Sequence, residues 1–206
     1  MKLFATLALG LALLGCTSPH PQNTERPHRP PLEDGVAAFD RGDYQSAFHL
    51  FERSASAGNA EGQIRLARLY DRGDGVPQNY SEAVKWFRLA AEQGSAEGQS
   101  NLGAFYSLGR GVPQNYLEAV KWFRLAAEQG NASAQFNLAS MYALGRGVPK
   151  DYVQALKWFN VSASRSVSAT DRYMALSSVT DVASMMTPAQ IREAHELAVQ
   201  WKPTKR

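Results

Sequence analysis

Apolar positions recur along this chain with the spacing of an α-helix, and the whole pattern returns every 36 residues. Between residues 116 and 127 the spacing is three and four, which places the apolar residues on one helix face: Tyr116, Ala119, Phe123 and Ala127. A similar segment runs from Ala96 to Tyr106, and a link with Gly109, Gly111 and Pro113 separates the two. Each period therefore predicts two helices joined by a glycine-rich link.

The repetition is close to verbatim in the middle of the chain. Segments Val76–Gln99 and Val112–Gln135 are identical at 20 of 24 positions, and a more divergent copy follows from Val148. A period of this length is the sequence signature of a solenoid or array. One helix pair cannot bury both of its faces, so successive units must stack to form a continuous core.

Capping residues mark the predicted helix ends. Asn115 can accept from free backbone N–H groups at the start of a helix, and Glu118 three residues later predicts a capping box. Asn79 with Glu82 repeats this pair, and Asp151 with Gln154 is a weaker copy. Gly130 is expected to end the helix that Asn115 begins, because glycine readily adopts the left-handed conformation of a C-terminal cap.

The repeated residues carry a family resemblance. The pattern Ala-x-x-Gln-x-x-Leu-Gly/Ala-x-x-Tyr, then Gly-x-Gly-Val-Pro, then Tyr-x-x-Ala-x-x-Trp-Phe-x-x-Ala-Ala resembles the Sel1-like repeat, a relative of the tetratricopeptide repeat. The resemblance covers roughly Gly35 to Trp201. It implies an all-α fold, a right-handed α-solenoid of stacked helix-turn-helix units. Residues 59–166 hold three repeat periods, and residues 32–58 lack the Gly-Val-Pro link and form an atypical, tetratricopeptide-like first hairpin.

The C-terminal part departs from the pattern. Residues 167–202 are predicted to form a capping helix pair that closes the stack. Asp171–Met186 is one helix, and Thr187 caps the next, with Pro188 at its first position. That second helix has an apolar stripe ending at Trp201. Residues 203–206 are expected to be a frayed, basic tail.

The N-terminal part resembles an export signal. Residues 1–16 combine a charged start with the apolar run Leu3–Leu14, which is too short to span a bilayer. The end of this run, Leu-Leu-Gly-Cys, resembles a bacterial lipobox, which implies lipidation of Cys16. Two alternatives are an ordinary signal peptide with a chance cysteine and a buried apolar helix. Thr17 replaces the aspartate usual in inner-membrane retention signals, so we expect a lipid-anchored envelope protein in the outer membrane, facing the periplasm.

Residues 17–31 are rich in proline and poor in apolar side chains, and they predict a semi-rigid tether. The formal net charge is only +3 and no basic block occurs, which argues against nucleic-acid binding. Familiar catalytic motifs are missing from the sequence, and lipidation would consume its single cysteine. The sequence therefore predicts neither an enzyme nor a bound metal or cofactor. Tryptophans 36 residues apart indicate packing between units rather than sugar stacking: Trp86, Trp122 and Trp158.

Candidate binding residues are those that differ between the near-identical repeats. In related tetratricopeptide arrays, the first helix of each unit lines a concave groove. By this resemblance, several residues that differ between the repeats of this chain would lie in such a groove. The alternative is drift at exposed positions that packing does not hold. The predicted groove residues are Glu61, Ile64, Arg65, Arg68, Asp71, Glu97, Ser100, Asn101, Ser107, Phe136, Asn137 and Ser140.

These features favour a membrane-anchored, non-enzymatic scaffold or adaptor that binds another envelope protein or peptide segment through the groove. Two other classes remain open. The first is a cell-wall enzyme or β-lactam-binding protein, because some cysteine-rich relatives of the repeat family are linked to penicillin binding. The paired cysteines of those relatives are missing here. The other is a murein- or glycan-binding module that uses exposed aromatic side chains.

Overall fold

A computed structural model of the chain describes residues 31–204, which form ten α-helices and no β-strand. The predicted signal peptide, Cys16 and the tether up to Pro30 lie outside the described residues. No helix among those described is both long enough and apolar enough to cross a membrane. The helices are α1 (Pro31–Asp40), α2 (Tyr44–Ser56), α3 (Ala60–Arg72), α4 (Tyr80–Glu92), α5 (Ala96–Leu108), α6 (Tyr116–Glu128), α7 (Ala132–Leu144), α8 (Tyr152–Arg165), α9 (Ala169–Ala183) and α10 (Pro188–Gln200).

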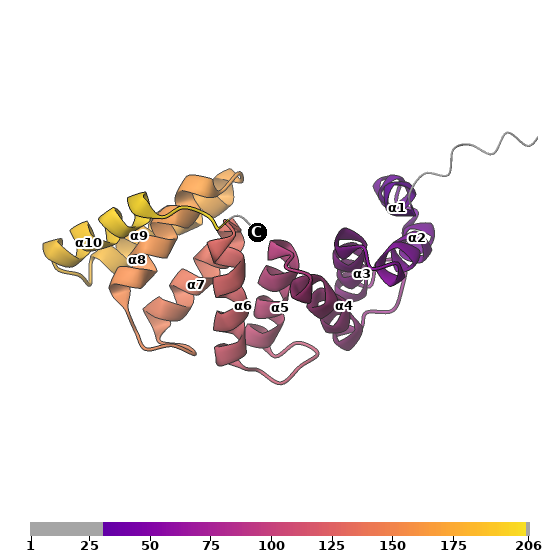
Figure 1. The fold of residues 1–206 in the computed structure, drawn as a ribbon, viewed down its shortest axis with the longest axis horizontal. Helices are drawn as coiled ribbons and strands as arrows, with labels where there is room; N and C mark the ends of the chain where they lie inside the picture. Colours follow the sequence, from indigo (N-terminus) through magenta and orange to yellow (C-terminus); the bar gives the residue numbers. More distant parts are fainter. Residues whose placement is uncertain (1–30, 205–206) are drawn as a thin grey trace, which may run out of the picture.

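The helices form an α-solenoid. From α1 to α9, each helix packs against the next one in the chain, and the stack bends into an arc with α1 and α10 near its two ends (Figure 1). Within the three repeats, α3, α5 and α7 are the first helices and are called A helices, whereas α4, α6 and α8 are called B helices. The all-α solenoid expected from the 36-residue period is confirmed.

The N-terminal caps are confirmed, but the predicted capping boxes of the repeats are not formed. The Asn115 side chain accepts from the Glu118 N–H at 3.1 Å. The Asn115 N–H itself donates to the Tyr106 carbonyl of the preceding A helix at 2.9 Å, so it is not available to Glu118. The Glu118 carboxylate instead lies 3.5 Å from Lys121. The complete capping box of the described residues is at Thr187, where Gln190 bonds back to the cap.

The glycine-rich link ties each unit to the preceding one. Gly111 has φ +65°, and a Cβ atom built there would lie 2.4 Å from the carbonyl carbon of Tyr80. The backbone of the link therefore crosses directly over the start of the preceding B helix, at a distance that only glycine permits. Gly75 and Gly147 make the same approach, to Tyr44 and Tyr116.

Buried glutamines form a repeated polar contact between units. Gln93 Nε2 donates to Gln63 Oε1 at 2.7 Å, and Gln129 Nε2 donates to Gln99 Oε1 at 2.8 Å. The third member, Gln135, is fully buried, yet its Oε1 has no hydrogen-bond partner among the described residues. One period after Gln129 the chain has Arg165, so the row of glutamines ends there.

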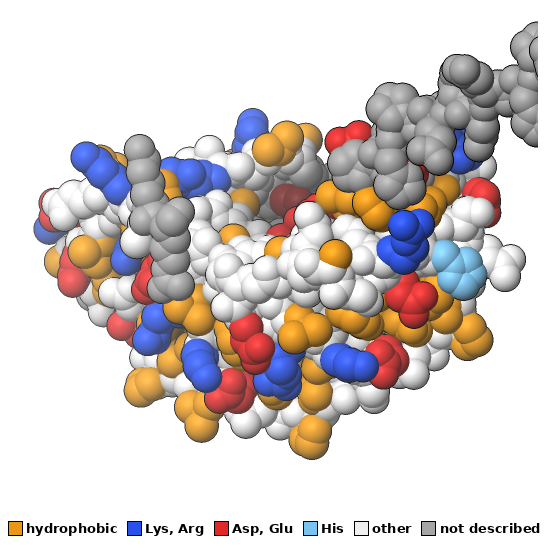
Figure 2. Space-filling view, turned by 45° about the vertical axis from the view of Figure 1, so that its right-hand side comes forward, with side chains coloured by type: hydrophobic (Ala, Val, Ile, Leu, Met, Phe, Trp, Pro, Cys, Tyr) orange, Lys and Arg blue, Asp and Glu red, His pale blue; other side chains and the backbone are white. Residues whose placement is uncertain are grey.

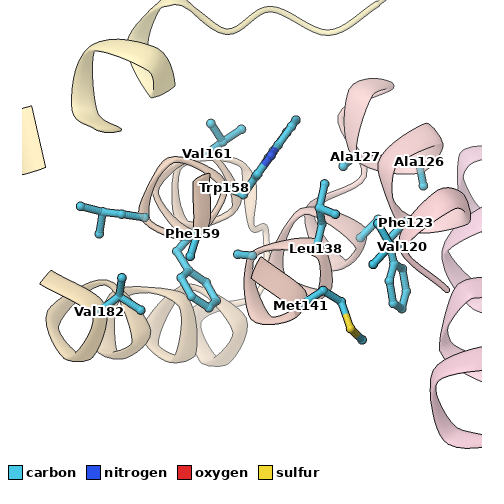
Figure 3. Close-up of a cluster of buried hydrophobic side chains, with 14 of the residues drawn as sticks. Val120, Phe123, Ala126, Ala127, Leu138, Met141, Trp158, Phe159, Val161 and Val182 are labelled. Atoms are coloured by element: carbon cyan, nitrogen blue, oxygen red, sulfur yellow. The ribbon is translucent and has the colours of Figure 1, made fainter. Parts of the chain in front are cut away.

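The core continues from unit to unit through apolar side chains of both helix types. Phe123, Leu138 and Phe159 are each at most 3% exposed and lie between α6, α7 and α8 (Figure 3). Trp122 and Trp158 are 8% and 5% exposed. These tryptophans therefore pack within the core, as their 36-residue spacing predicted.

The C-terminal helices do not form the predicted pair. Both α9 and α10 pack against α8, and they make few contacts with each other. The tail is not frayed at its start, because residues Trp201–Thr204, the C-terminal strap, fold back over the α6–α7 turn. Thr204 N–H donates to the Glu128 carbonyl at 2.8 Å. The Trp201 ring lies 5.7 Å from that of Trp158 and 4.7 Å from the Arg165 guanidinium.

Candidate protein-binding groove

The A helices bring half of the predicted groove residues together. A pocket of about 350 Å³ extends across α3, α5 and the start of α7, and we call it the charged pocket. Residues four apart on one helix face share one side of it, and stacking of the next A helix supplies the other side. Its lining residues are Glu61, Arg65, Arg68, Glu97, Ser100, Asn101, Asn131 and Ser133.

The charges in this pocket are paired. Arg65 Nε lies 2.7 Å from Glu61 Oε1 within α3, and Arg68 of α3 forms an ion pair with Glu97 of α5. The Arg65 guanidinium also lies 5.8 Å from the centre of the Phe51 ring. All four charged side chains are one-third to one-half exposed, so solvent screens both ion pairs. Each side chain can therefore leave its ion pair and bind a charged group of a partner at a small cost in free energy.

Three predicted groove residues are held by their own helix, and of these Asn101 lines the charged pocket. Asn101 Nδ2 donates to the Glu97 carbonyl at 2.8 Å, and Ser107 Oγ donates to the Ala104 carbonyl at 2.9 Å. Ser140 does the same on α7, donating to the Phe136 carbonyl at 3.0 Å. Because this bond uses one of the two amide hydrogens of Asn101, its second N–H and its amide oxygen remain for a ligand.

The structure corrects the expected exposure of some predicted residues. Ile64 is 2% exposed and packs in the core with Phe87 and Leu102, so a partner cannot reach it. Ser100 is only 8% exposed, although it lines the charged pocket. Asp71 is half-buried near the C-terminal end of α3 and does not line the charged pocket. The period assigned all three to the groove, but neighbouring helices cover that face more widely than expected.

A second pocket, of about 260 Å³, lies between α7, α8 and α9, and we call it the apolar pocket. It includes the predicted residues Phe136 and Asn137. It meets the charged pocket at Ser133, which lines both. Four of its residues come from α8 onward and were missed from the sequence, although exposed Met174 is a signal in hindsight: Ser162, Ser166, Asp171 and Met174.

The shifted pKa values of the described residues belong to groups outside both pockets. Burial raises the pKa of Tyr70, with Glu82 and Glu52 adding to the effect. Burial lowers the pKa of Lys157, and Glu128 acts in the opposite direction. The Ser46 hydroxyl and N–H lower the pKa of Asp43 at the start of α2. Within residues 31–204, no three His, Cys, Asp or Glu side chains lie close enough to hold a metal ion.

The B-helix surface carries a different charge pattern. In the space-filling view, acidic and basic side chains alternate across the lower part of the visible face, with hydrophobic side chains between them (Figure 2). Glu82 with Lys85 and Glu118 with Lys121 are equivalent pairs on α4 and α6, at 3.3 and 3.5 Å. Because these pairs repeat with the period, they provide matched controls for charge changes in the groove.

Comparison with known proteins gives one family and a set of solved structures. The Sel1 repeat model matches residues 33–59, 60–95, 96–131 and 132–167. A Sel1 repeat protein from Oxalobacter formigenes is 29% identical, with a TM-score of 0.69, over 83% of this chain and 68% of that one. A protective antigen of uropathogenic Escherichia coli with an SLR fold is also 29% identical, with a TM-score of 0.56, over 83% of this chain and 44% of that one.

No curated protein matches the chain significantly. The chain spans less than half the length of the E. coli antigen, so that protein's properties are not transferred to it. Four consecutive repeats of this type indicate a scaffold for protein–protein interaction. Because they make up most of its length, the chain belongs to the Sel1 repeat family.

Proposed function

We propose that this protein is a lipid-anchored, non-enzymatic adaptor of the bacterial cell envelope, which binds a segment of another envelope protein in the A-helix groove. One observation carries the groove assignment. Six residues at positions that differ between otherwise near-identical repeats, from Glu61 to Asn101, line one pocket. A polypeptide segment bound in this pocket would contact all six, which supports the groove as the binding site. Cys16 would hold the lipid, and the outer membrane facing the periplasm is the proposed location.

The chemistry of the groove favours a polypeptide ligand over a nucleic acid. Arginine and glutamate are present in equal numbers in the charged pocket and are paired with each other. A phosphate backbone would require an excess of cations, which this pocket does not offer. A peptide segment can match paired charges and use the Asn101 amide oxygen as a hydrogen-bond acceptor.

The groove is tested by affinity capture with the full chain, extracted in detergent and immobilised. An Arg68→Glu variant places a second acidic group opposite Glu97, and we expect it to lose a partner that the wild type retains. Lys85→Glu makes the same charge change on α4, outside the groove, and should retain it. The charge-swapped double variant Arg68→Glu with Glu97→Arg separates loss of the ion pair from loss of partner recognition.

Each outcome has a defined meaning. A protein that wild type and Lys85→Glu retain but Arg68→Glu loses, and that captures the chain in the reverse experiment, supports the adaptor. Retention by all variants would exclude the charged pocket as the binding site. Pelleting with purified sacculi or covalent labelling by a fluorescent penicillin would instead support a glycan-binding or cell-wall function.

The anchor is tested separately by fractionation. A Cys16→Ser chain cannot accept the lipid, so we expect it to leave the membrane fraction while the wild type remains there. Anchoring takes more than one acyl chain to be stable, and a triacylated cysteine would provide this. Equal membrane association of both chains would overturn the lipoprotein assignment without affecting the groove.

A further inference from the structure

The apolar pocket lies beside a turn that differs from the turns inside the repeats. Those turns end in glycines with positive φ, such as Gly94 at +89° and Gly130 at +96°. After α8 the corresponding residue is Ser166, which has an extended conformation with φ −64° and ψ 122°. A pocket of about 260 Å³ lies between α7, α8 and α9.

Two of the three hydroxyl groups that line the pocket are satisfied by the protein itself. Ser162 Oγ donates to the Ala132 carbonyl and Ser166 Oγ to the Ser162 carbonyl, both at 2.9 Å. Besides the polar side chains of Ser133, Asn137 and Asp171, the groups that remain for a ligand to contact are carbon. They come from Ala132, Phe136 and the Met174 side chain, which is 46% exposed.

The size and rigidity of the pocket suit one large side chain. Its volume is below the range of about 300–1,000 Å³ that is typical of small-molecule sites. The Phe136 ring is held by an edge-to-face contact with the Phe159 ring, at a centroid distance of 5.2 Å. Met174 opposite is unbranched and can adjust to the shape of the incoming group.

Charge at the rim adds a second requirement. Asp171 is exposed and is the one charged residue among the described ones that line this pocket. Arg172 follows it in the chain, but its guanidinium is directed to the Ser166 carbonyl, to which it donates at 2.9 Å. A ligand with a cation beside its apolar group would complement the Asp171 carboxylate, and an acidic ligand would be repelled.

We propose that the apolar pocket is the specificity site of the groove. It takes one large apolar side chain, such as Leu, Met or Phe, from a partner segment that carries Lys or Arg a few residues away. The remainder of the segment passes Ser133 into the charged pocket. This inference rests on the proposed function, because it assumes that the groove binds a polypeptide.

The test is selection from a display library of random linear peptides on the immobilised full chain. We expect selected peptides to share one large apolar position and a nearby Lys or Arg. Met174→Asp should weaken binding of a selected peptide about 10- to 100-fold, because a charge then faces the buried apolar group. The same substitution at Met185, which is 59% exposed and lies outside the pocket, is the matched control.

The rim charge is tested with Asp171→Asn against Asp181→Asn, a control on the same helix. An exposed ion pair is weak, so we expect a loss of about two- to fivefold for Asp171→Asn at low salt, decreasing as salt is added. Selected peptides without a cation, or equal effects of the two substitutions, would overturn the charge requirement.

The outcomes separate this inference from the function on which it rests. Peptides that lose binding with Arg68→Glu but not with Met174→Asp would overturn the apolar pocket as specificity site and leave the groove in place. Peptides that are indifferent to both substitutions would overturn both proposals. Peptides that need both sites, with an apolar and a basic residue in common, support both.

Discussion

In the middle repeats and in the C-terminal region, successive helices are held against each other by different contacts. Between α3 and α6, each unit is fixed by a glycine link over the preceding helix and by the pairing of Gln63 with Gln93. Beyond α8 both devices are missing, because Ala183 stands one period after the link residue Gly147 and Arg165 replaces the glutamine. The C-terminal strap, through Trp201, and the turned-back α10 cover α8 instead.

The difference teaches where this fold can vary. The repeats are fixed by backbone contacts, and several of the residues that differ between them, such as Arg65 and Asn101, line the groove. The C-terminal region is fixed by side chains of a few large residues, and its irregular geometry leaves the apolar pocket open. We therefore expect substitutions in the two regions to differ in size and in how far their effects spread.

The largest effect is expected at the glycine links. Gly111→Ala adds a Cβ atom 2.4 Å from the Tyr80 carbonyl carbon, at φ +65°. The left-handed conformation costs about 1–2 kcal/mol and the backbone overlap adds to it, so we expect a loss of about 3 kcal/mol or more. Gly94→Ala also has a positive φ but open space around its Cβ, and should lose only about 1–2 kcal/mol. Urea denaturation followed by circular dichroism measures both, and equal losses would contradict the role of the link.

The C-terminal strap should give the next largest effect, confined to the C-terminal region. Trp201→Ala removes the contacts with Trp158 and Arg165, and we expect a loss of about 2–3 kcal/mol. Hydrogen exchange should become faster in α8 and α10 and stay unchanged in α4, since units contact only their neighbours. Faster exchange throughout the stack would show that the strap stabilises the whole solenoid.

The glutamine row provides a smaller, paired comparison. Gln99→Leu removes a buried hydrogen bond to the Ala91 carbonyl and a part-buried one from Gln129, and we expect a loss of about 2 kcal/mol. Gln135→Leu removes one, to the Ala127 carbonyl, together with an oxygen that has no partner among the described residues, so its loss should stay below about 1 kcal/mol. Denaturation midpoints of the two variants decide this, and a larger loss for Gln135→Leu would contradict the interpretation.

The smallest effect is a pH dependence at the first hairpin. The hydrogen bonds from Ser46 keep the pKa of Asp43 below its ordinary value of 3.8. A lowered folded-state pKa contributes stability above about pH 4, and this contribution is lost as the pH falls through the folded-state pKa. The wild type should therefore lose more stability than Asp43→Asn on acidification below about pH 4. Parallel pH profiles of the two proteins would show that the cap does not depend on charge.

Local patterns predicted the elements well because their causes are local. The side chains of Asn115 and Thr187 cap helices within three residues, and the apolar period alone places Phe123 in the core. The charged pocket was also largely predictable, since stacking of similar units brings equivalent faces together, as Arg68 and Glu97 show. The burial of Ile64 could not be predicted from the sequence, because it depends on how closely two helices approach each other.

The sequence by itself determined a solenoid of stacked helix pairs, because its 36-residue period repeats both the helix caps and the core residues. Tertiary structure alone decided how the stack ends. Whether α10 packs on α9 or turns back onto α8 depends on which distant apolar faces meet, and no local signal encodes that choice. The same applies to the C-terminal strap and the apolar pocket. Both arise from non-local contacts made after the period has ended.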